Sequence, residues 1–224
     1  MQITIVYNNI TKKGFKKGWG FSCVIKHPEG LMLFDTGCDG PGLIYNLKKL
    51  DVPINKIKTI FLTHDHWDHT GGLFNVLEKN SNLKVILPYS FSEKFKQEIE
   101  SRVEIIEVKK KKKLFDNIYS TGEFKKNHCE QALILNTQQG YVLVTGCSHP
   151  GLESFLKISI QINKPHALIG GLHNFSNMKL LSQFQKIGAC HCTKEMSKIK
   201  KLFAPKHLPV RVGDKFDFNL YGAK

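Results

Sequence analysis

Residues 63–72 read Thr-His-Asp-His-Trp-Asp-His-Thr-Gly-Gly. They begin at the last residue of an apolar, strand-like segment, 58–63. In an extended backbone, side chains two positions apart point to the same side, so His64 and His66 can reach one cation. Asp68 and His69 then enter a helical turn, where their offset lets them face a second cation. Histidine and aspartate are costly to gather in a core, so a metal site explains this cluster better than a purely structural role. The stretch therefore predicts a dinuclear metal site.

The pattern His-x-His-x-Asp-His after an apolar strand, followed by Thr-Gly-Gly, closely resembles the signature of the metallo-β-lactamase superfamily. Segment 33–37, Leu-Phe-Asp-Thr-Gly, resembles the superfamily's preceding motif, whose aspartate orients the site from just outside the metal ligands. The resemblance implies that Asp35 accepts the second N–H of a ligating imidazole. A structural cap is the alternative role for this residue.

Later segments resemble one branch of this superfamily nearly end to end. The branch is related to 7,8-dihydropterin-6-yl-methyl-4-(β-D-ribofuranosyl)aminobenzene-5'-phosphate synthase, a pterin-pathway enzyme. The matching segments are 19–22, 144–151, 170–173, 190–193 and 210–214. The chain departs from the branch at Asn174, where an apolar residue is usual, and at Lys194, where glycine is common.

Two further metal ligands must come from later strand ends, because sites of this kind draw on several strands. His149 and His191 are predicted to supply them, since each follows an apolar, strand-like run within a segment that matches the branch. The expected ligand sets are His64, His66 and His149 for the first metal, and Asp68, His69 and His191 for the second. Zinc is the expected ion, although manganese or iron would also suit nitrogen and carboxylate ligands.

Two other residues leave alternatives open. Cys147 stands where many superfamily members have an aspartate that bridges the metals. Water or hydroxide could bridge alone, or the thiolate could join the ligands and favour softer ions, but ordinary packing is the preferred interpretation. His128 precedes a strand pattern and is interpreted as structural, with an approach to the site as the alternative. His27 and His207 are expected at the surface.

The whole chain, 1–224, is expected to form a single domain. Hairpin patterns span 21–34 and 132–145, and no linker-like tract divides the chain. Two halves, each of strands followed by helices, combine with the resemblance to predict an α/β (α+β) fold, the four-layer αββα metallo-β-lactamase sandwich. Neither a membrane span nor a signal peptide is evident, and six cysteines are few, so we expect a cytoplasmic protein whose thiols form no disulfides.

The formal net charge of +14 raises the question of a nucleic-acid partner, because cations neutralise phosphates. The excess is nearly all lysine spread along the chain, whereas nucleic-acid readers lean on arginine, and Arg102 and Arg211 are the only arginines. A small anionic substrate is therefore favoured. The densest cluster, Lys109–Lys113, is predicted to be a solvated loop, with an anion-attracting rim of the active site as the alternative.

The chemistry that these residues predict is metal-assisted hydrolysis. Two cations lower the pKa of a shared water toward about 7 and stabilise developing negative charge. Asp68 is also placed to take a proton from the nucleophile, and His173 is a candidate for substrate contact or proton transfer. The resemblance implies a phosphate-bearing, pterin-like or phosphodiester substrate. The alternatives are an RNA-processing nuclease, a lactonase or thioesterase, and a non-enzymatic metal scaffold; a flavin-coupled diiron reductase would need a carboxylate in place of His66.

Overall fold

The structure is a computed structural model that describes residues 1–219. The chain forms two compact units. Unit 1 is Met1–Lys109 with Arg211–Asp217, and unit 2 is Lys110–Val210 with Phe218 and Asn219. Both units contain one large mixed sheet with helices packed against it, which confirms the predicted mixed α/β class with two helix-flanked sheets. The expectation of a single domain stays a prediction.

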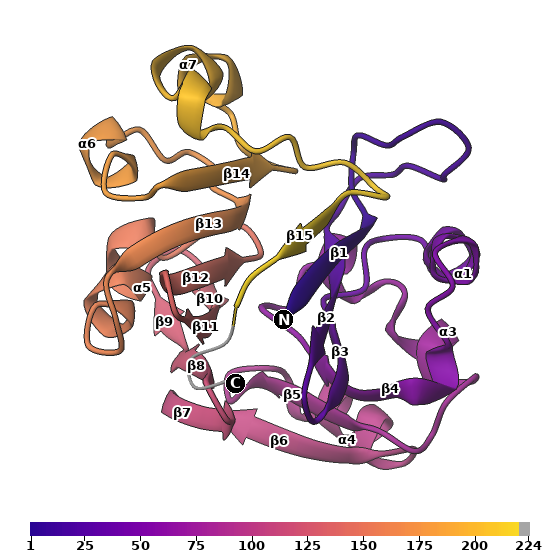
Figure 1. Ribbon diagram of the computed structural model, residues 1–224. Coiled ribbons are helices and arrows are strands. Elements are labelled where there is room, and N and C mark those ends of the chain that lie inside the picture. The colour runs from indigo at the N-terminus through magenta and orange to yellow at the C-terminus, as the bar shows by residue number, and fades with distance from the viewer. Residues whose placement is uncertain (220–224) are drawn as a thin grey trace. The chain divides into compact units, whose positions relative to one another are not determined.

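The sheet of unit 1 has seven strands in the order β15-β1-β2-β3-β4-β5-β6 (Figure 1). The strands are β1 Gln2–Tyr7, β2 Ser22–His27, β3 Gly30–Phe34, β4 Ile57–Phe61, β5 Lys84–Pro88, β6 Glu104–Val108 and β15 Lys215–Asp217. Pairing is antiparallel from β15 to β3 and parallel from β3 to β6. The predicted first hairpin is confirmed as β2 and β3, which pair His27 with Gly30 at the turn.

The helices of unit 1 cover one face of its sheet. They are α1 Gly40–Lys49, the 3-10 turn η1 Ile54–Lys56, α2 Trp67–Thr70, α3 Leu73–Leu77 and α4 Glu93–Glu100. Helix α1 begins after Asp39, whose carboxylate accepts a hydrogen bond from the backbone N–H of Gly42. Leu43 and Leu47 lie four residues apart on one face of α1 and enter a core that also contains Leu33 of β3.

The sheet of unit 2 has six strands in the order β14-β13-β12-β11-β8-β7. They are β7 Lys110–Phe115, β8 Ile118–Gly122, β11 Leu133–Thr137, β12 Gly140–Thr145, β13 Pro165–Gly171 and β14 Lys186–Cys190. The strands from β7 to β12 pair antiparallel, whereas β12, β13 and β14 run parallel. The predicted second hairpin is confirmed as β11 and β12, and a small ribbon is formed by β9 Phe124–Lys125 and β10 Cys129–Glu130.

Three helices and a 3-10 turn belong to unit 2: α5 Leu152–Ser159, α6 Met178–Leu181, α7 Met196–Leu202 and η2 Ala204–Lys206. Phe155 of α5, Leu181 of α6 and Ile199 of α7 are fully buried in one core with strand residues such as Leu143 and Leu168. The helices thereby pack against the parallel strands of unit 2. The carboxyl ends of these strands carry the site residues predicted in the second half of the chain.

Two sequence predictions are wrong. The lysine run at Lys109–Lys113 is not a loop, because Lys110 to Lys113 belong to the edge strand β7, which pairs with β8 alone. An edge strand can carry exposed lysines, and their charge opposes pairing with another chain. His27 is not at the surface: it is buried at the end of β2, and this burial lowers its pKa. His207 is half-buried rather than exposed.

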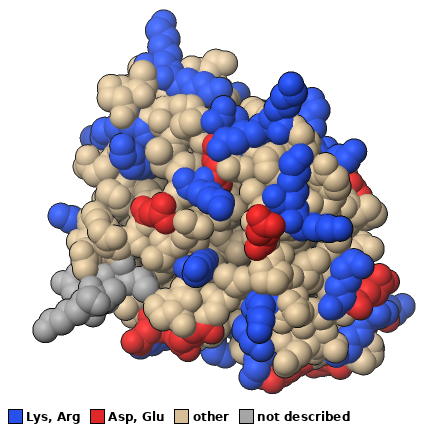
Figure 2. Space-filling model, turned by 45° about the vertical axis from the view of Figure 1, so that its right-hand side comes forward, with Lys and Arg blue, Asp and Glu red and all other residues tan. Residues whose placement is uncertain are grey.

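The cationic surplus forms no single patch on the face shown in Figure 2, where lysines and arginines are scattered and several have acidic neighbours. Among residues 1–219, no helix has the length and apolar character needed to cross a bilayer. None of the six cysteines, all of which the structure describes, forms a disulfide.

Candidate functional site

The histidine motif of unit 1 follows strand β4 and leads into the short helix α2. The rings of His64 and His66 meet edge to face, and Nε2 of His64 lies 3.2 Å from Nδ1 of His66. One turn on, Nε2 of His69 lies 3.8 Å from Oδ2 of Asp68. The ring centroids of His64 and His69 are 4.2 Å apart, so the structure brings these predicted ligands of unit 1 into one cluster.

Asp35, which follows the neighbouring parallel strand β3, fixes two of these imidazoles. Its Oδ2 accepts a hydrogen bond of 2.7 Å from Nδ1 of His69 and another of 2.8 Å from the hydroxyl of Thr63. Because that hydroxyl has one proton and gives it to Asp35, it must accept the 2.9 Å hydrogen bond from Nδ1 of His64. In both histidines the lone pair is therefore on Nε2, the atom through which each would bind a metal.

The Asp35 carboxylate is completely buried, and burial raises its pKa, although the hydrogen bonds from His69 and Thr63 oppose the rise. Its Oδ1 also accepts the backbone N–H of Thr63 at 2.8 Å. Asp35 has a φ of 49°, in the left-handed region that non-glycine residues seldom adopt. This conformation turns the chain sharply at the end of β3 and directs the carboxylate to the histidine motif.

Glycines around the motif are needed for close packing of the backbone. A Cβ on Gly71 would lie 2.5 Å from the carbonyl oxygen of Cys38, and a Cβ on Gly20 would collide with the carbonyl oxygen of Asp68. The Thr-Gly-Gly ending of the motif and the glycine of segment 19–22 thus keep α2 tightly against its neighbours within unit 1.

In unit 2, the candidate residues gather at the carboxyl ends of the three parallel strands. Cys147 and His149 follow β12, His173 follows β13, and His191 follows β14. Three residues in these loops have left-handed backbones: Ser148 (φ 62°), His173 (φ 42°) and His191 (φ 52°). Such strained turns at strand ends are frequent at functional sites, where neighbouring structure holds them in place.

A buried carboxylate that the sequence analysis missed holds the first of these loops. Oε1 of Glu130 accepts the backbone N–H groups of Cys147 and Ser148, both at 2.9 Å, and Oε2 accepts that of His149 at 2.8 Å. Glu130 has no exposed surface. Three N–H donors compensate the buried negative charge, so the loop that carries Cys147 and His149 is fixed by Glu130.

A sulfur and nitrogen cluster occupies the ends of β12 and β14. The Sγ atoms of Cys147 and Cys192 are 3.2 Å apart, and the ligand atoms of these two cysteines and His191 all lie within 4.8 Å of one another. Cys192 was not predicted as a ligand from the sequence. Two thiols and an imidazole at this spacing form a donor set that suits zinc and softer ions.

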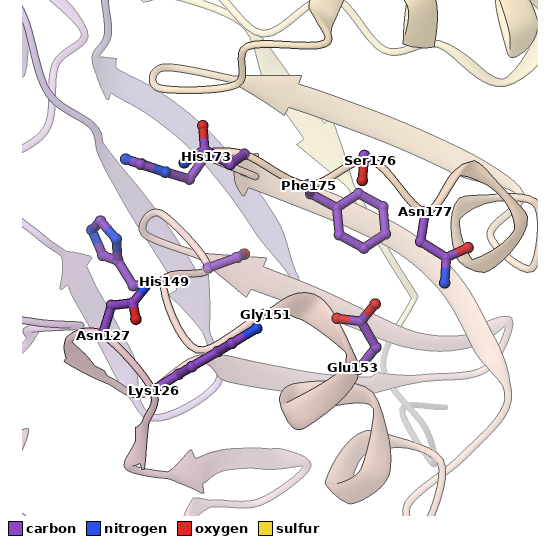
Figure 3. Close-up of a pocket in the computed structure, with 11 residues that line it drawn as sticks. Lys126, Asn127, His149, Gly151, Glu153, His173, Phe175, Ser176 and Asn177 are labelled. Atoms are coloured by element: carbon purple, nitrogen blue, oxygen red, sulfur yellow. The ribbon is translucent and has the colours of Figure 1, made fainter.

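His149 and His173 line a pocket of about 360 Å³ within unit 2, and their ring centroids are 4.7 Å apart (Figure 3). The ring of His128 also lies near His149, at a centroid distance of 5.5 Å. Burial, followed by the nearby Lys194, lowers the pKa of His173. His173 is therefore neutral at pH 7 and able to accept a proton.

The donor atoms present fit divalent cations. In unit 1, histidine nitrogens and the Asp68 carboxylate lie together, and Asp35 sets the tautomers of the histidines that it orients. In unit 2, the imidazole of His191 and two cysteine thiols lie close to one another. Histidine, aspartate and cysteine are the usual ligands of zinc. The predicted ligands in each unit thus form a local group with suitable chemistry, and their assignment to two particular metals stays a prediction.

Residues 20–124 match the family model of the metallo-β-lactamase superfamily. This confirms the resemblance found in the motif. Among individual proteins, the chain is similar to a 7,8-dihydropterin-6-methyl-4-(β-D-ribofuranosyl)-aminobenzene-5'-phosphate synthase of Methanocaldococcus jannaschii. The two are 28% identical over 220 residues, covering 72% of this chain and 75% of that relative.

Solved structures show the same fold. Tm1679, a metal-dependent hydrolase of the β-lactamase superfamily, aligns with a TM-score of 0.80 at 23% identity, covering 97% of this chain and 98% of that chain. A diphosphatase of the PhnP family aligns with a TM-score of 0.64 at 14% identity, covering 98% of each chain. At these identities the likeness shows the metallo-β-lactamase fold alone.

Proposed function

We propose that this protein is a metal-dependent hydrolase that acts on a small, phosphate-bearing molecule of the pterin-like or phosphodiester class. The observation that carries the proposal is the hydrogen-bond chain from Asp35 to His64 and His69 through Thr63, which puts both Nε2 lone pairs in the ligand-binding state. The relative whose name includes a ribofuranosyl phosphate supports the substrate class.

Two divalent cations, with zinc as the default, would be held by the predicted ligands: His64, His66 and His149 for one, and Asp68, His69 and His191 for the other. When bound, such a pair supplies a water of lowered pKa and neutralises negative charge on a phosphoryl group. Cys147 and Cys192 add thiolate donors beside His191 within unit 2. Their presence favours zinc or iron over the harder magnesium ion.

The chain's own residues supply the proton transfers. Asp68 is assigned to take the proton released by the attacking water, since its carboxylate lies beside the imidazole of His69. His173 is neutral at pH 7 and borders the pocket, so it is assigned to exchange a proton with the substrate or leaving group. Asp35 and Glu130 are positioning residues, which hold His69 and the 147–149 loop respectively.

A small anionic substrate is favoured over nucleic acid. The lysines are scattered on the face shown in Figure 2, and the pocket beside His149 has a volume suited to a small molecule. We further propose that the protein works in the cytoplasm, since its six cysteines form no disulfides and reducing compartments keep thiols in that state.

The test is hydrolysis of bis-p-nitrophenyl phosphate by the purified protein, before chelation, after chelation and after zinc, manganese or iron is returned. The proposal predicts turnover that disappears with the metal and returns with it. A rate that is the same with and without metal would refute the metal-dependent mechanism. Metal-dependent turnover of a lactone or thioester, with none of any phosphate ester, would refute the substrate class.

A further inference from the structure

The pocket in unit 2 has a composition that points to a particular ligand. Its walls come from residues 126–127 between β9 and β10, from residues 148, 149, 151 and 153 before and within the start of α5, and from residues 173–177 after β13 (Figure 3). With about 360 Å³ it lies at the lower end of the range of about 300–1,000 Å³ found for ligand pockets. A small molecule would therefore fill it while touching His149 and His173.

Two opposite charges face this space. Among the described residues that line the pocket, Lys126 is the one lysine and Glu153 the one carboxylate, and both side chains are exposed. Figure 3 shows the Lys126 side chain extended along the pocket toward Gly151, with Glu153 farther along. Both charges are thus available to a ligand, and they would attract different groups of it.

The position of Glu153 depends on the glycine before its helix. Gly151 precedes α5 with a φ of 93°, and a Cβ there would lie 3.0 Å from Oε2 of Glu153. The absence of a side chain at 151 leaves room for the carboxylate to fold back toward the pocket. Phe175 and Asn177 line the same pocket as Glu153 (Figure 3).

These groups define the chemistry of the ligand. A carboxylate accepts two N–H bonds side by side, and such a pair is offered by the edge of an aminopyrimidinone ring, the ring that pterins and guanine share. An aromatic side chain such as Phe175 packs well against a planar ring. A lysine ammonium binds phosphate as a point charge, and the repulsion from Glu153 would keep a phosphate at the lysine.

We propose that this pocket is the substrate-recognition subsite, which binds an aminopyrimidinone ring at Glu153 and a phosphate group at Lys126. The proposal rests on the proposed function, because it gives the pterin-like, phosphate-bearing substrate its place beside His149 and His173. It assigns Lys126 and Glu153 as specificity-determining residues. They bind the parts of the substrate that distinguish it from other phosphate esters.

Three commercially available probes separate the two contacts. Guanosine 5'-monophosphate carries both the ring edge and the phosphate, guanosine lacks the phosphate, and inosine 5'-monophosphate lacks the amino group. Isothermal titration calorimetry on the full chain should show the first binding more tightly than the other two. Lys126→Ala should weaken guanosine monophosphate binding about ten- to hundredfold and leave guanosine unaffected. Glu153→Gln should abolish the preference for guanosine monophosphate over inosine monophosphate.

The matched control is Lys125→Ala, which removes an equal charge from the adjacent, exposed residue outside the pocket lining. Equal weakening by Lys125→Ala and Lys126→Ala would show nonspecific attraction and overturn the proposal. So would an unchanged preference in Glu153→Gln. Metal content and bis-p-nitrophenyl phosphate turnover of the unmutated protein give a separate readout. If the protein shows no turnover but binds nucleotide in a Lys126-dependent way, the proposed reaction is refuted and the subsite stands. If it shows metal-dependent turnover but its nucleotide binding does not depend on Lys126, the subsite is refuted and the reaction stands.

Discussion

The carboxylate of Asp35 accepts a 2.7 Å hydrogen bond from Nδ1 of His69, and both side chains are completely buried. This contact connects the end of strand β3 with helix α2 and determines which nitrogen of His69 carries the lone pair. The same carboxylate holds Thr63, and through it His64. One aspartate thus orients two predicted metal ligands.

Asp35→Asn should weaken metal binding about ten- to hundredfold, because the amide cannot serve as a charged acceptor for His69 and Thr63 together. Competition with a chromophoric chelator measures the change. Asp51→Asn is the matched control, since Asp51 is exposed and asparagine tolerates its left-handed backbone (φ 55°). Equal metal affinity in Asp35→Asn and the unmutated protein would show that Asp35 has only a structural role.

Glu130→Gln should lower the free energy of unfolding by about 1–3 kcal/mol, because an amide group cannot accept all three N–H donors of the 147–149 loop. Its turnover of bis-p-nitrophenyl phosphate should fall as well, since the loop positions His149. Urea unfolding and the hydrolysis assay measure the two effects. Glu78→Gln, at an exposed position away from this loop in the sequence, should change neither. Full stability in Glu130→Gln would contradict the role assigned to the carboxylate.

His66→Ala should remove at least one equivalent of metal and abolish hydrolysis while leaving the fold largely intact. The side chain is only partly buried, so its loss leaves a small cavity, and far-UV circular dichroism should stay unchanged. Elemental analysis gives the metal content. His207→Ala, at a half-buried position in unit 2 that is outside the motif, serves as the control for loss of a histidine. Full activity in His66→Ala would refute the site assignment.

Asp214 gives a prediction on pH. Burial alone would raise the pKa of Asp214, but hydrogen bonds from Arg211 and Lys12 more than offset it, so its pKa lies below the ordinary value. An acid with a lowered folded-state pKa stabilises the fold above its unfolded pKa of about 3.9, and this contribution is lost as the pH falls through the folded-state pKa.

Asp214→Asn should therefore lower the free energy of unfolding at pH 7 by about 1–3 kcal/mol, with the difference from the unmutated protein shrinking below about pH 4. Urea unfolding between pH 3 and 7 measures this. Asp217→Asn, on the exposed strand β15, is the control. A difference that grows as the pH falls would contradict the stated sign.

The local parts of the fold and site were predictable from the sequence because their signals are local. The ligand-type residues of 64–69 lie within one turn and one strand end, and the hairpins of both units have alternating strands around a short turn. Asp35 was found through its motif. These features depend on backbone geometry that neighbouring residues impose on one another.

Other features depend on tertiary structure and were missed. Glu130 reads as an ordinary acid beside a strand, and only the approach of the 147–149 loop shows why it is buried. The pair of Cys147 and Cys192 requires β12 and β14 to run in the same direction within one sheet. The lysines of β7 have poor strand propensity, and pairing with β8 overrides it.

Elemental analysis of protein purified without added metal shows whether this chain holds the two proposed metal ions. We expect about two equivalents of a divalent metal per chain, with zinc predominant. Protein that contains no metal as purified, and takes up none when zinc, manganese or iron is supplied, would contradict this expectation.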